Sequence, residues 1–314
     1  KEDIQYLVGR MGYSASLAVA AGADAVELHA YGGYLLDQFH SKQWNDRTDE
    51  YGGCLRNRMR FTLECIEAIK ANVPKNFPVL VKFTPYHGVP GGRELEEGLE
   101  MAKILEESGI SALHVDVGCY EAWYKAISTV YAPEGHQLNV VKAVKEVVSC
   151  PVLGQGKLFD PEKAEKAVED GILDYVVLAH QMLADPAWAN KVKAGQIDDI
   201  RPCVGCNECL LAGFSGKHYY CAVNPPCYAE HDYALPKPNG TSRKVLVIGG
   251  GPGGMEAAIT AAERGFDAEL WEKSGRLGGN LWAAGSPTFK HDVLNLITYM
   301  ETQLKKHGVR VVCN

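Results

Sequence analysis

The sequence contains no uninterrupted run of about 18 apolar residues, which is roughly what a membrane-spanning helix needs. The first residues, Lys1, Glu2 and Asp3, do not begin a leader of the secretory type, in which a basic stretch precedes an apolar one. We therefore expect a cytoplasmic protein with no membrane partner.

An excess of positive charge is also missing. The 32 Lys and Arg residues are outnumbered by 39 Asp and Glu residues, which gives a formal net charge of −7. Binding to a phosphate backbone needs a concentrated basic surface, and here the basic residues are intermixed with acidic ones. The composition argues against a nucleic-acid partner and favours small-molecule ligands.

Cysteine is too sparse for a secreted scaffold held by disulfides. The chain has 10 cysteines in 314 residues, and five of them are scattered. The other five fall within 25 residues: Cys203, Cys206, Cys209, Cys221 and Cys227. Such a cluster indicates a metal site in a reducing compartment.

What the chain does contain is an alternation of strands and helices. Short apolar runs rich in β-branched residues alternate with amphipathic stretches, the pattern of βαβ units and a parallel sheet. The predicted strands are residues 25–30, 78–84, 112–118, 151–155 and 173–179, and the predicted helices are 58–71, 95–108, 139–148 and 161–170. Polar residues such as Glu27, Lys82 and Asp116 occur at the carboxyl ends of the strands, where a (β/α)₈ barrel assembles its site. We therefore predict an α/β fold with a partial TIM barrel, in preference to an open doubly wound sheet.

The most specific motif is Cys203-Val-Gly-Cys206-Asn-Glu-Cys209, followed by Cys221 after eleven intervening residues. Three thiolates at this spacing and a fourth from a distance suit the iron corners of a [4Fe–4S] cubane. Structural zinc is the alternative, although its four-cysteine sites usually come as two C-x₂-C pairs. Cys227 is a second candidate for the fourth ligand, but Cys221 needs the shorter loop.

A glycine-rich run lies between a predicted strand and a predicted helix, at residues 244–248 and 255–265. In this run Gly249 permits a tight turn, Gly251 lets the backbone approach a pyrophosphate, and Gly254 lets helix and strand pack closely. Glu272 follows 23 residues after Gly249, at the end of a strand predicted at residues 268–271, where a carboxylate can accept from a ribose hydroxyl. The run predicts FAD or NAD binding in a Rossmann-like domain, with a plain glycine-rich turn as the alternative.

These motifs divide the chain into four segments. They are a barrel part at residues 1–200, a cluster module at 201–234, a linker at 235–243 and an incomplete nucleotide-binding domain at 244–314. Only units four to eight of a barrel fit into the first segment, so we expect three units before Lys1. The last segment is too short for a complete domain, so we expect the protein to continue past Asn314.

A third motif runs from Val26 to Phe39 and places His29 at a strand end with Tyr34 five residues later. Both could face one pocket, as a hydrogen-bond donor and a proton donor, while packing at a barrel rim is the alternative for such a Tyr. Together with Arg47–Gly53 and Asn57-Arg58, this segment resembles the Old Yellow Enzyme family. The barrel segment is followed by a cysteine cluster and then by a second nucleotide-binding domain. This arrangement resembles that of the 2,4-dienoyl-CoA reductase and trimethylamine dehydrogenase branch.

The resemblance implies an oxidoreductase with FMN in the barrel, a [4Fe–4S] cluster, FAD and NAD(P)H. It also implies that His29 hydrogen-bonds a substrate carbonyl and that Tyr34 gives a proton to the α-carbon, while hydride from reduced FMN reaches the β-carbon. Tyr120 aligns with a second catalytic residue, a His in the dienoyl reductases, and its role stays open between catalysis and packing.

The resemblance further places Lys82 near the pyrimidine edge of the flavin. The two turns that grip the FMN phosphate in the family match Gly154, Gly156 and Lys157, and Ala179 with His180. Both turns usually carry Arg, so the phosphate would depend more on backbone N–H groups here. We expect the loops at residues 86–93 and 121–136 to set the substrate.

The leading hypothesis is an NAD(P)H-dependent ene-reductase of an α,β-unsaturated carbonyl compound: an enoate, a dienoyl-CoA, or a steroid, bile-acid or flavonoid enone. An amine dehydrogenase of the trimethylamine dehydrogenase type is the rival within this architecture. A non-catalytic electron-transfer fragment is a third hypothesis. The sequence leaves open whether the protein forms a homo-oligomer and whether it uses NADH or NADPH.

Overall fold

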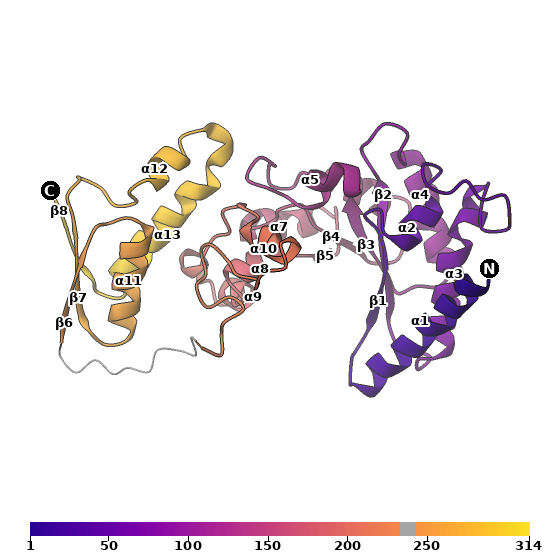
Figure 1. The fold of residues 1–314 in the computed structure, drawn as a ribbon, viewed down its shortest axis with the longest axis horizontal. Helices are drawn as coiled ribbons and strands as arrows, with labels where there is room; N and C mark the ends of the chain where they lie inside the picture. Colours follow the sequence, from indigo (N-terminus) through magenta and orange to yellow (C-terminus); the bar gives the residue numbers. More distant parts are fainter. Residues whose placement is uncertain (233–242) are drawn as a thin grey trace. The chain divides into compact units, whose positions relative to one another are not determined.

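The computed structural model describes residues 1–232 and 243–314 (Figure 1). The predicted linker lies almost wholly outside the described residues. Contacts divide the chain into two compact units, residues 1–128 with 134–177, and residues 129–133 with 178–314. Each unit is described by itself below, and the domain boundaries drawn from the motifs stay predictions.

The first unit is built on a parallel sheet of five strands in the order β1-β2-β3-β4-β5. The strands are β1 (Val26–Ala30), β2 (Val79–Tyr86), β3 (Ala112–Val117), β4 (Val152–Gly154) and β5 (Tyr175–Val176). Each strand pairs with the one that follows it along the chain, as in a (β/α)₈ barrel, whereas the order reverses in a doubly wound sheet. The last two strands are shorter than predicted, and Tyr175 of β5 is 60% exposed.

Helices connect the strands of the first unit. They are α1 (Glu2–Ala20), α2 (Leu35–His40), α3 (Leu55–Ala71), α4 (Leu95–Glu107), η1 (Tyr120–Ala122), α5 (Trp123–Ala126), α6 (Leu138–Lys145) and α7 (Pro161–Glu169). The sequence signals act locally as expected, since Asp160 caps α7 by accepting the Glu162 N–H and Pro161 occupies the first turn. Helices α3 and α4 pack against β2 (Figure 1), and Phe61, Met101 and Phe83 are almost fully buried between them.

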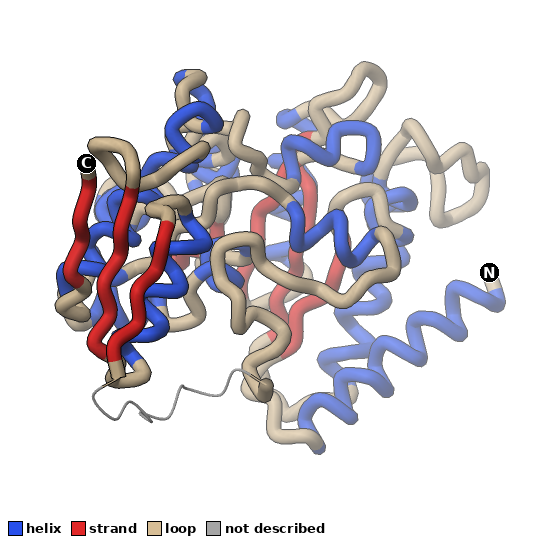
Figure 2. Tube along the Cα trace, turned by 60° about the vertical axis from the view of Figure 1, so that its left-hand side comes forward, coloured by secondary structure: helices blue, strands red, loops and turns tan. Residues whose placement is uncertain are grey.

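The second unit contains a parallel sheet of three strands, β6 (Lys244–Ile248), β7 (Asp267–Glu272) and β8 (Arg310–Cys313), which lie side by side in Figure 2. Its helices are α8 (His180–Ala184), α9 (Trp188–Lys193), η2 (Ile197–Asp199), α10 (Glu208–Phe214), α11 (Pro252–Glu263), α12 (Leu281–Ala284), η3 (Thr288–Lys290) and α13 (Asp292–Lys306). Helix α11 begins three residues earlier than predicted, because Pro252 suits the first helical position and starts the helix inside the glycine run.

One apolar core joins the cysteine-rich segment to the nucleotide-binding part of the second unit. Met255 of α11, Leu270 of β7 and Met300 of α13 form its centre, each at most 3% exposed. Ala184 and Val223 join the same core from the segments on either side of the cysteine motif. The two sequence segments therefore fold as one body.

No helix in residues 1–232 or 243–314 combines the length and the apolar character that crossing a membrane requires.

Candidate active site and cofactor sites

Tyr34 and His29 lie side by side at the carboxyl end of β1. His29 is on the strand, and the extended backbone of Tyr34 immediately precedes α2. Gly32 and Gly33, with φ of 71° and 84°, make the sharp turn between them, a conformation that favours glycine. The two rings meet edge to face with centroids 4.7 Å apart. The structure thus brings together the residues that the sequence predicts as the catalytic pair.

The protonation states of this pair follow from their surroundings. Burial lowers the pKa of His29, and the nearby charge of Lys82 lowers it further, so the neutral imidazole predominates at pH 7. A hydrogen bond with Tyr120 and partial burial raise the pKa of Tyr34 to about 12. The phenol therefore keeps its proton at neutral pH.

Tyr120, whose role the sequence left open, is the first residue of η1. It lies next to Tyr34. Its ring centroid is 5.0 Å from that of Tyr34 and 4.7 Å from that of Trp123. Tyr31 completes the group, 4.5 Å from His29. We refer to His29, Tyr31, Tyr34, Tyr120 and Trp123 as the aromatic cluster.

A row of polar side chains crosses the sheet beside the aromatic cluster. The strand register aligns His29 with Lys82, and Lys82 with His114. The Lys82 ammonium lies 3.0 Å from the carboxylate of Asp116 and 4.1 Å from the centroid of the Tyr31 ring. Burial raises the pKa of Asp116, and the Lys82 charge opposes that rise. The Lys82 cation beside the His29 ring suits the polar edge of a flavin, whereas both ring nitrogens of His114 already contact Glu27 and Gln155, so Lys82 and His29 fit FMN.

Three buried residues behind the Tyr34 loop were not assigned a role from the sequence. The side chains of Asp37, His87 and Arg93 have no exposed surface, although residues 86–93 were expected to meet substrate. Burial alone would raise the pKa of Asp37, but the Arg93 charge and a hydrogen bond from His87 hold it well below its usual range. The sequence did contain one signal for this group. Asp37 lies among the apolar residues Leu35, Leu36 and Phe39, and a charge that is buried in such a stretch needs a partner.

The first predicted phosphate turn follows β4. Gly154 and Gly156 are both needed for packing, since a Cβ on Gly154 would lie 2.8 Å from Val141 and one on Gly156 would lie 2.9 Å from the backbone N of Gln137. Lys157 is 6% exposed and has a φ of 63°. Phosphate binding by this turn stays a prediction.

The second predicted phosphate turn, Ala179 and His180, belongs to the second unit, where His180 begins α8. Burial lowers the pKa of His180, so the ring contributes little positive charge at pH 7. Its part in FMN binding also stays a prediction.

The four cysteines predicted as cluster ligands line one small cavity: Cys203, Cys206, Cys209 and Cys221. Cys227 is buried, but it is not among the residues that line this cavity. Within the part of the chain that the structure describes, no three His, Cys, Asp or Glu side chains surround a position for a single metal ion. Four thiols around one shared cavity could serve as the ligands of a [4Fe–4S] cluster, and the choice between this cluster and zinc stays a prediction.

The glycine run forms a tight turn before α11. Gly249 has a φ of 104°, and a Cβ on Gly254 would lie 1.9 Å from the Gly249 carbonyl oxygen. A Cβ on Gly251 would meet no atom within 4 Å, which leaves room for a pyrophosphate. Glu272 accepts the Gly250 N–H at 2.6 Å, and this bond lowers its pKa. These residues fit a dinucleotide.

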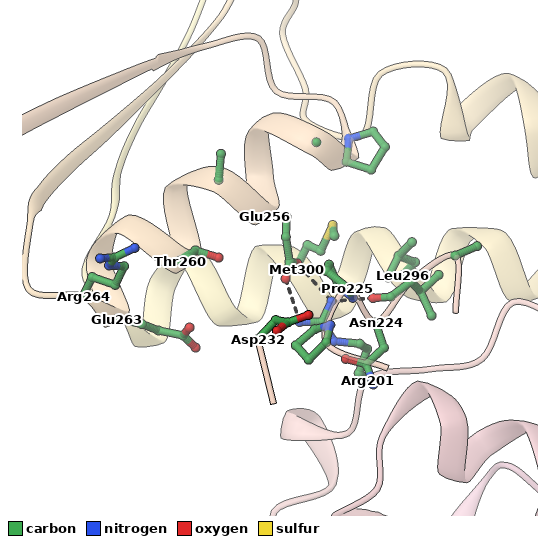
Figure 3. A pocket seen from close by; sticks show the side chains of 16 residues that line it. Arg201, Asn224, Pro225, Asp232, Glu256, Thr260, Glu263, Arg264, Leu296 and Met300 are labelled. Carbon is green, nitrogen blue, oxygen red and sulfur yellow. Dashed lines mark hydrogen bonds and ion pairs between the residues drawn. The ribbon is translucent and has the colours of Figure 1, made fainter. Parts of the chain in front are cut away.

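A cavity of about 1000 Å³, which the sequence did not predict, lies between α11, α13 and the segment after Cys221 (Figure 3). Arg201 and Glu256 meet in its wall, with two hydrogen bonds of 2.9 and 3.0 Å. Since Arg201 is two residues before Cys203, this ion pair joins the cysteine motif to α11.

Residues 1–199 match the model of the NADH:flavin oxidoreductase / NADH oxidase family. The chain belongs to this family. Residues 244–310 match a second model, described as FAD dependent oxidoreductase. These matches confirm the predicted Old Yellow Enzyme-type ancestry, the oxidoreductase class and the flavin chemistry.

Individual relatives cover the whole chain. A protein of Clostridium sporogenes named cinnamate reductase is 40% identical over 329 residues, 100% of this chain and 49% of the relative. The structure of a 2-naphthoyl-CoA reductase complex matches with a TM-score of 0.96 and 32% identity over 100% of this chain and 48% of that one. Histamine dehydrogenase from Rhizobium sp. 4-9 matches with a TM-score of 0.91 and 29% identity over 100% and 46%.

The chain spans about half the length of the curated relatives it matches. The structural likenesses confirm the predicted α/β fold with part of a TIM barrel. The roles given above to individual residues of this flavin oxidoreductase stay predictions.

Proposed function

We propose that the whole protein is an NAD(P)H-dependent ene-reductase that saturates the C=C bond of an α,β-unsaturated carbonyl compound. The observation that carries the proposal is the contact between the rings of Tyr34 and His29, 4.7 Å apart. Each residue is in the protonation state that the reaction needs, because Tyr34 keeps its proton and His29 is a neutral N–H donor at pH 7. Two of the relatives are named as reductases of cinnamate and of 2-naphthoyl-CoA, which supports this reading.

The chemistry divides between the cofactor and the chain. FMN, held beside Lys82, would supply a hydride to the β-carbon. The His29 ring would hydrogen-bond the substrate carbonyl and favour negative charge on its oxygen. The Tyr34 hydroxyl would give its proton to the α-carbon and regain one from solvent. One hydride and one proton then add across the double bond.

The second unit would deliver the electrons. Cys203, Cys206, Cys209 and Cys221 would hold a [4Fe–4S] cluster, which is a one-electron carrier. The turn at Gly249–Gly254 would hold the pyrophosphate of FAD, which accepts a hydride from NAD(P)H.

The aromatic cluster suggests the class of substrate. Tyr120 is 49% exposed, and its ring is tilted by only 31° against that of Trp123. A pair of aromatic rings contributes about 0.5–1.5 kcal/mol to binding beyond the effect of buried area. The exposed ring of Tyr120 would therefore favour a substrate with a flat conjugated group. We therefore propose an enoate or enoyl thioester that carries an aryl group.

The test is steady-state turnover of the full-length protein without oxygen. NADH oxidation is measured with a cinnamate-type enoate, with an aliphatic enoate, and with no acceptor, and amine oxidation is measured with an artificial electron acceptor. We expect turnover with the aryl enoate and a loss of about 10²–10⁴-fold in Tyr34→Phe. Tyr6→Phe, at a site 66% exposed, is the matched control and should keep full activity.

Two outcomes would overturn the proposal. Amine oxidation without enoate reduction would assign the protein to the amine dehydrogenases. Zinc in place of iron, or a full-length protein without FMN, would remove the electron path.

A further inference from the structure

The loop that carries Tyr34 is held by two backbone amides. The Gly32 N–H donates to the Thr84 hydroxyl at 2.9 Å, and the Gly33 N–H donates to the Asp37 carboxylate at 2.8 Å. Both acceptors are completely buried. Because Tyr34 follows Gly33 directly, these two bonds set the position from which its side chain extends.

The two residues that supply these acceptors, Thr84 and Asp37, are both bound by one nitrogen of Arg93. Its Nη1 donates to Oδ1 of Asp37 at 2.7 Å and to the Thr84 carbonyl oxygen at 2.5 Å. The Nε and Nη2 atoms of Arg93 have no hydrogen-bond partner among the residues that the structure describes. The polar contacts of this side chain therefore all pass through Nη1.

His87 fixes the other oxygen of the carboxylate. Its Nδ1 accepts the backbone N–H of Arg93 at 3.0 Å, so Nε2 carries the ring proton. Nε2 then donates to Oδ2 of Asp37 at 3.1 Å, the same oxygen that accepts the Gly33 N–H. The carboxylate is thus held by a cation on one side and by two neutral donors on the other.

We propose that Arg93 is a positioning residue for proton donation by Tyr34. It fixes the Gly32–Gly33 turn, which precedes Tyr34, through its contacts with Asp37 and Thr84. The inference rests on the proposed role of Tyr34 as the proton donor. The Arg93 side chain has no exposed surface, so it would act without touching substrate.

The test compares three variants of the full-length protein. Arg93→Met removes the Nη1 contacts, and Arg93→Lys should keep them, because one ammonium can take the place of Nη1, whose partners are the ones that the Arg93 side chain has among the described residues. Arg58→Met is the matched control, since Arg58 is also buried, at 1% exposure, and its Nε and Nη1 donate to the carbonyl oxygens of His40 and Gly53.

Two quantities are measured on each variant. One is hydrogen exchange of the Gly32 and Gly33 amides. The other is the kcat for an enone divided by the kcat for a quinone, which accepts electrons without a proton from Tyr34. A merely structural role would lower both kcat values together and leave their ratio unchanged.

In Arg93→Met we expect both amides to exchange at least about tenfold faster. We expect the enone-to-quinone ratio to fall about 10- to 100-fold, as a displacement of about 1 Å would cause. Arg93→Lys should restore both quantities to within about threefold, and Arg58→Met should change neither. A folded Arg93→Met protein with an unchanged ratio would overturn the proposal.

If Arg93→Met does not fold, Asp37→Asn replaces it. Asn keeps an oxygen for the Gly33 N–H but loses the charge that holds Arg93, so the same fall in the ratio is expected, and an unchanged ratio again overturns the proposal. The double variant Tyr34→Phe/Arg93→Met should be no slower than Tyr34→Phe, and an additive loss would show that Arg93 acts elsewhere. If Tyr34→Phe alone leaves enone reduction unchanged, the proposed function fails, while amide exchange still reports whether Arg93 holds the turn.

Discussion

Arg201 and Glu256 form a bidentate ion pair across 55 positions of the sequence. The Arg201 guanidinium also donates to the Val223 carbonyl oxygen at 2.7 Å and lies 5.1 Å from the centroid of the Tyr299 ring. Its side chain is 14% exposed and that of Glu256 is 22% exposed. One side chain thus holds together the start of the cysteine motif, the segment after Cys221, α11 and α13.

Removing this guanidinium should destabilise the second unit. Because Arg201→Met leaves the Glu256 carboxylate largely buried and unpaired, we expect the free energy of unfolding to fall by about 2–4 kcal/mol. Urea denaturation of the full-length protein, followed by the loss of cluster absorbance, measures this. Arg56→Met is the control, because Arg56 pairs with Glu107 at 66% exposure and should change stability by less than about 1 kcal/mol. Equal effects of the two variants would contradict the structural role of the pair.

Two neighbouring glycines should differ sharply in their tolerance of alanine. A Cβ on Gly254 would lie 1.9 Å from the Gly249 carbonyl oxygen, whereas one on Gly253 meets no atom within 4 Å. Gly254→Ala should therefore open the turn and lower the bound FAD to less than about a tenth of the normal content. Gly253→Ala should keep its FAD and stabilise α11 by about 0.5–1 kcal/mol. Flavin content after acid release is the measurement, and normal FAD in Gly254→Ala would refute the expected geometry.

The fourth cluster ligand can be identified by exchanging sulfur for oxygen. Cys221 lines the cavity with the other three cysteines and Cys227 does not. Cys221→Ser should therefore lose most of the iron and acid-labile sulfide, while Cys227→Ser should keep about four of each per chain. Both variants are assayed after anaerobic purification. Loss of iron only in Cys227→Ser would exchange the two assignments.

The alkaline limit of enone reduction should depend on Tyr120. Tyr34 can donate only while protonated, and the hydrogen bond with Tyr120 helps to raise its pKa to about 12. Activity should therefore not fall through loss of this proton until the pH approaches that value. Tyr120→Phe removes the hydrogen bond, so the pKa of Tyr34 should move down toward its ordinary value of about 10, and the alkaline limb should move with it. Profiles of kcat/KM up to about pH 10.5 measure the shift, and superimposable profiles would exclude the effect.

The units of the barrel could be predicted because their signals are local. The strand Ala112–Val117 is short and fully buried and carries Ala, Leu and two Val among its six residues, and Asp160-Pro161 marks a helix start by its own chemistry. The proximity of the four cysteines could be expected for the same reason, since three of them lie within seven residues of sequence.

The ion pairs could not be predicted in this way. Arg93 meets Asp37 across 56 positions, and that pairing depends on how β2 is placed against the loop after β1. Gly154 shows a second limit of motif reading, because the predicted phosphate turn assigns it a functional place while a Cβ there would also overlap Val141 and Leu173. A motif can indicate why a residue type is present, but it does not show whether packing requires the same residue.

Glu272 limits how the ribose end of the proposed FAD site could be redesigned. Its Oε2 accepts the Gly250 N–H at 2.6 Å, and its Oε1 accepts the Ser274 N–H at 2.8 Å. Replacing this acid would change the local charge and would also remove the acceptor of two backbone amides. A redesigned ribose site would therefore have to rebuild the glycine turn together with the acidic position.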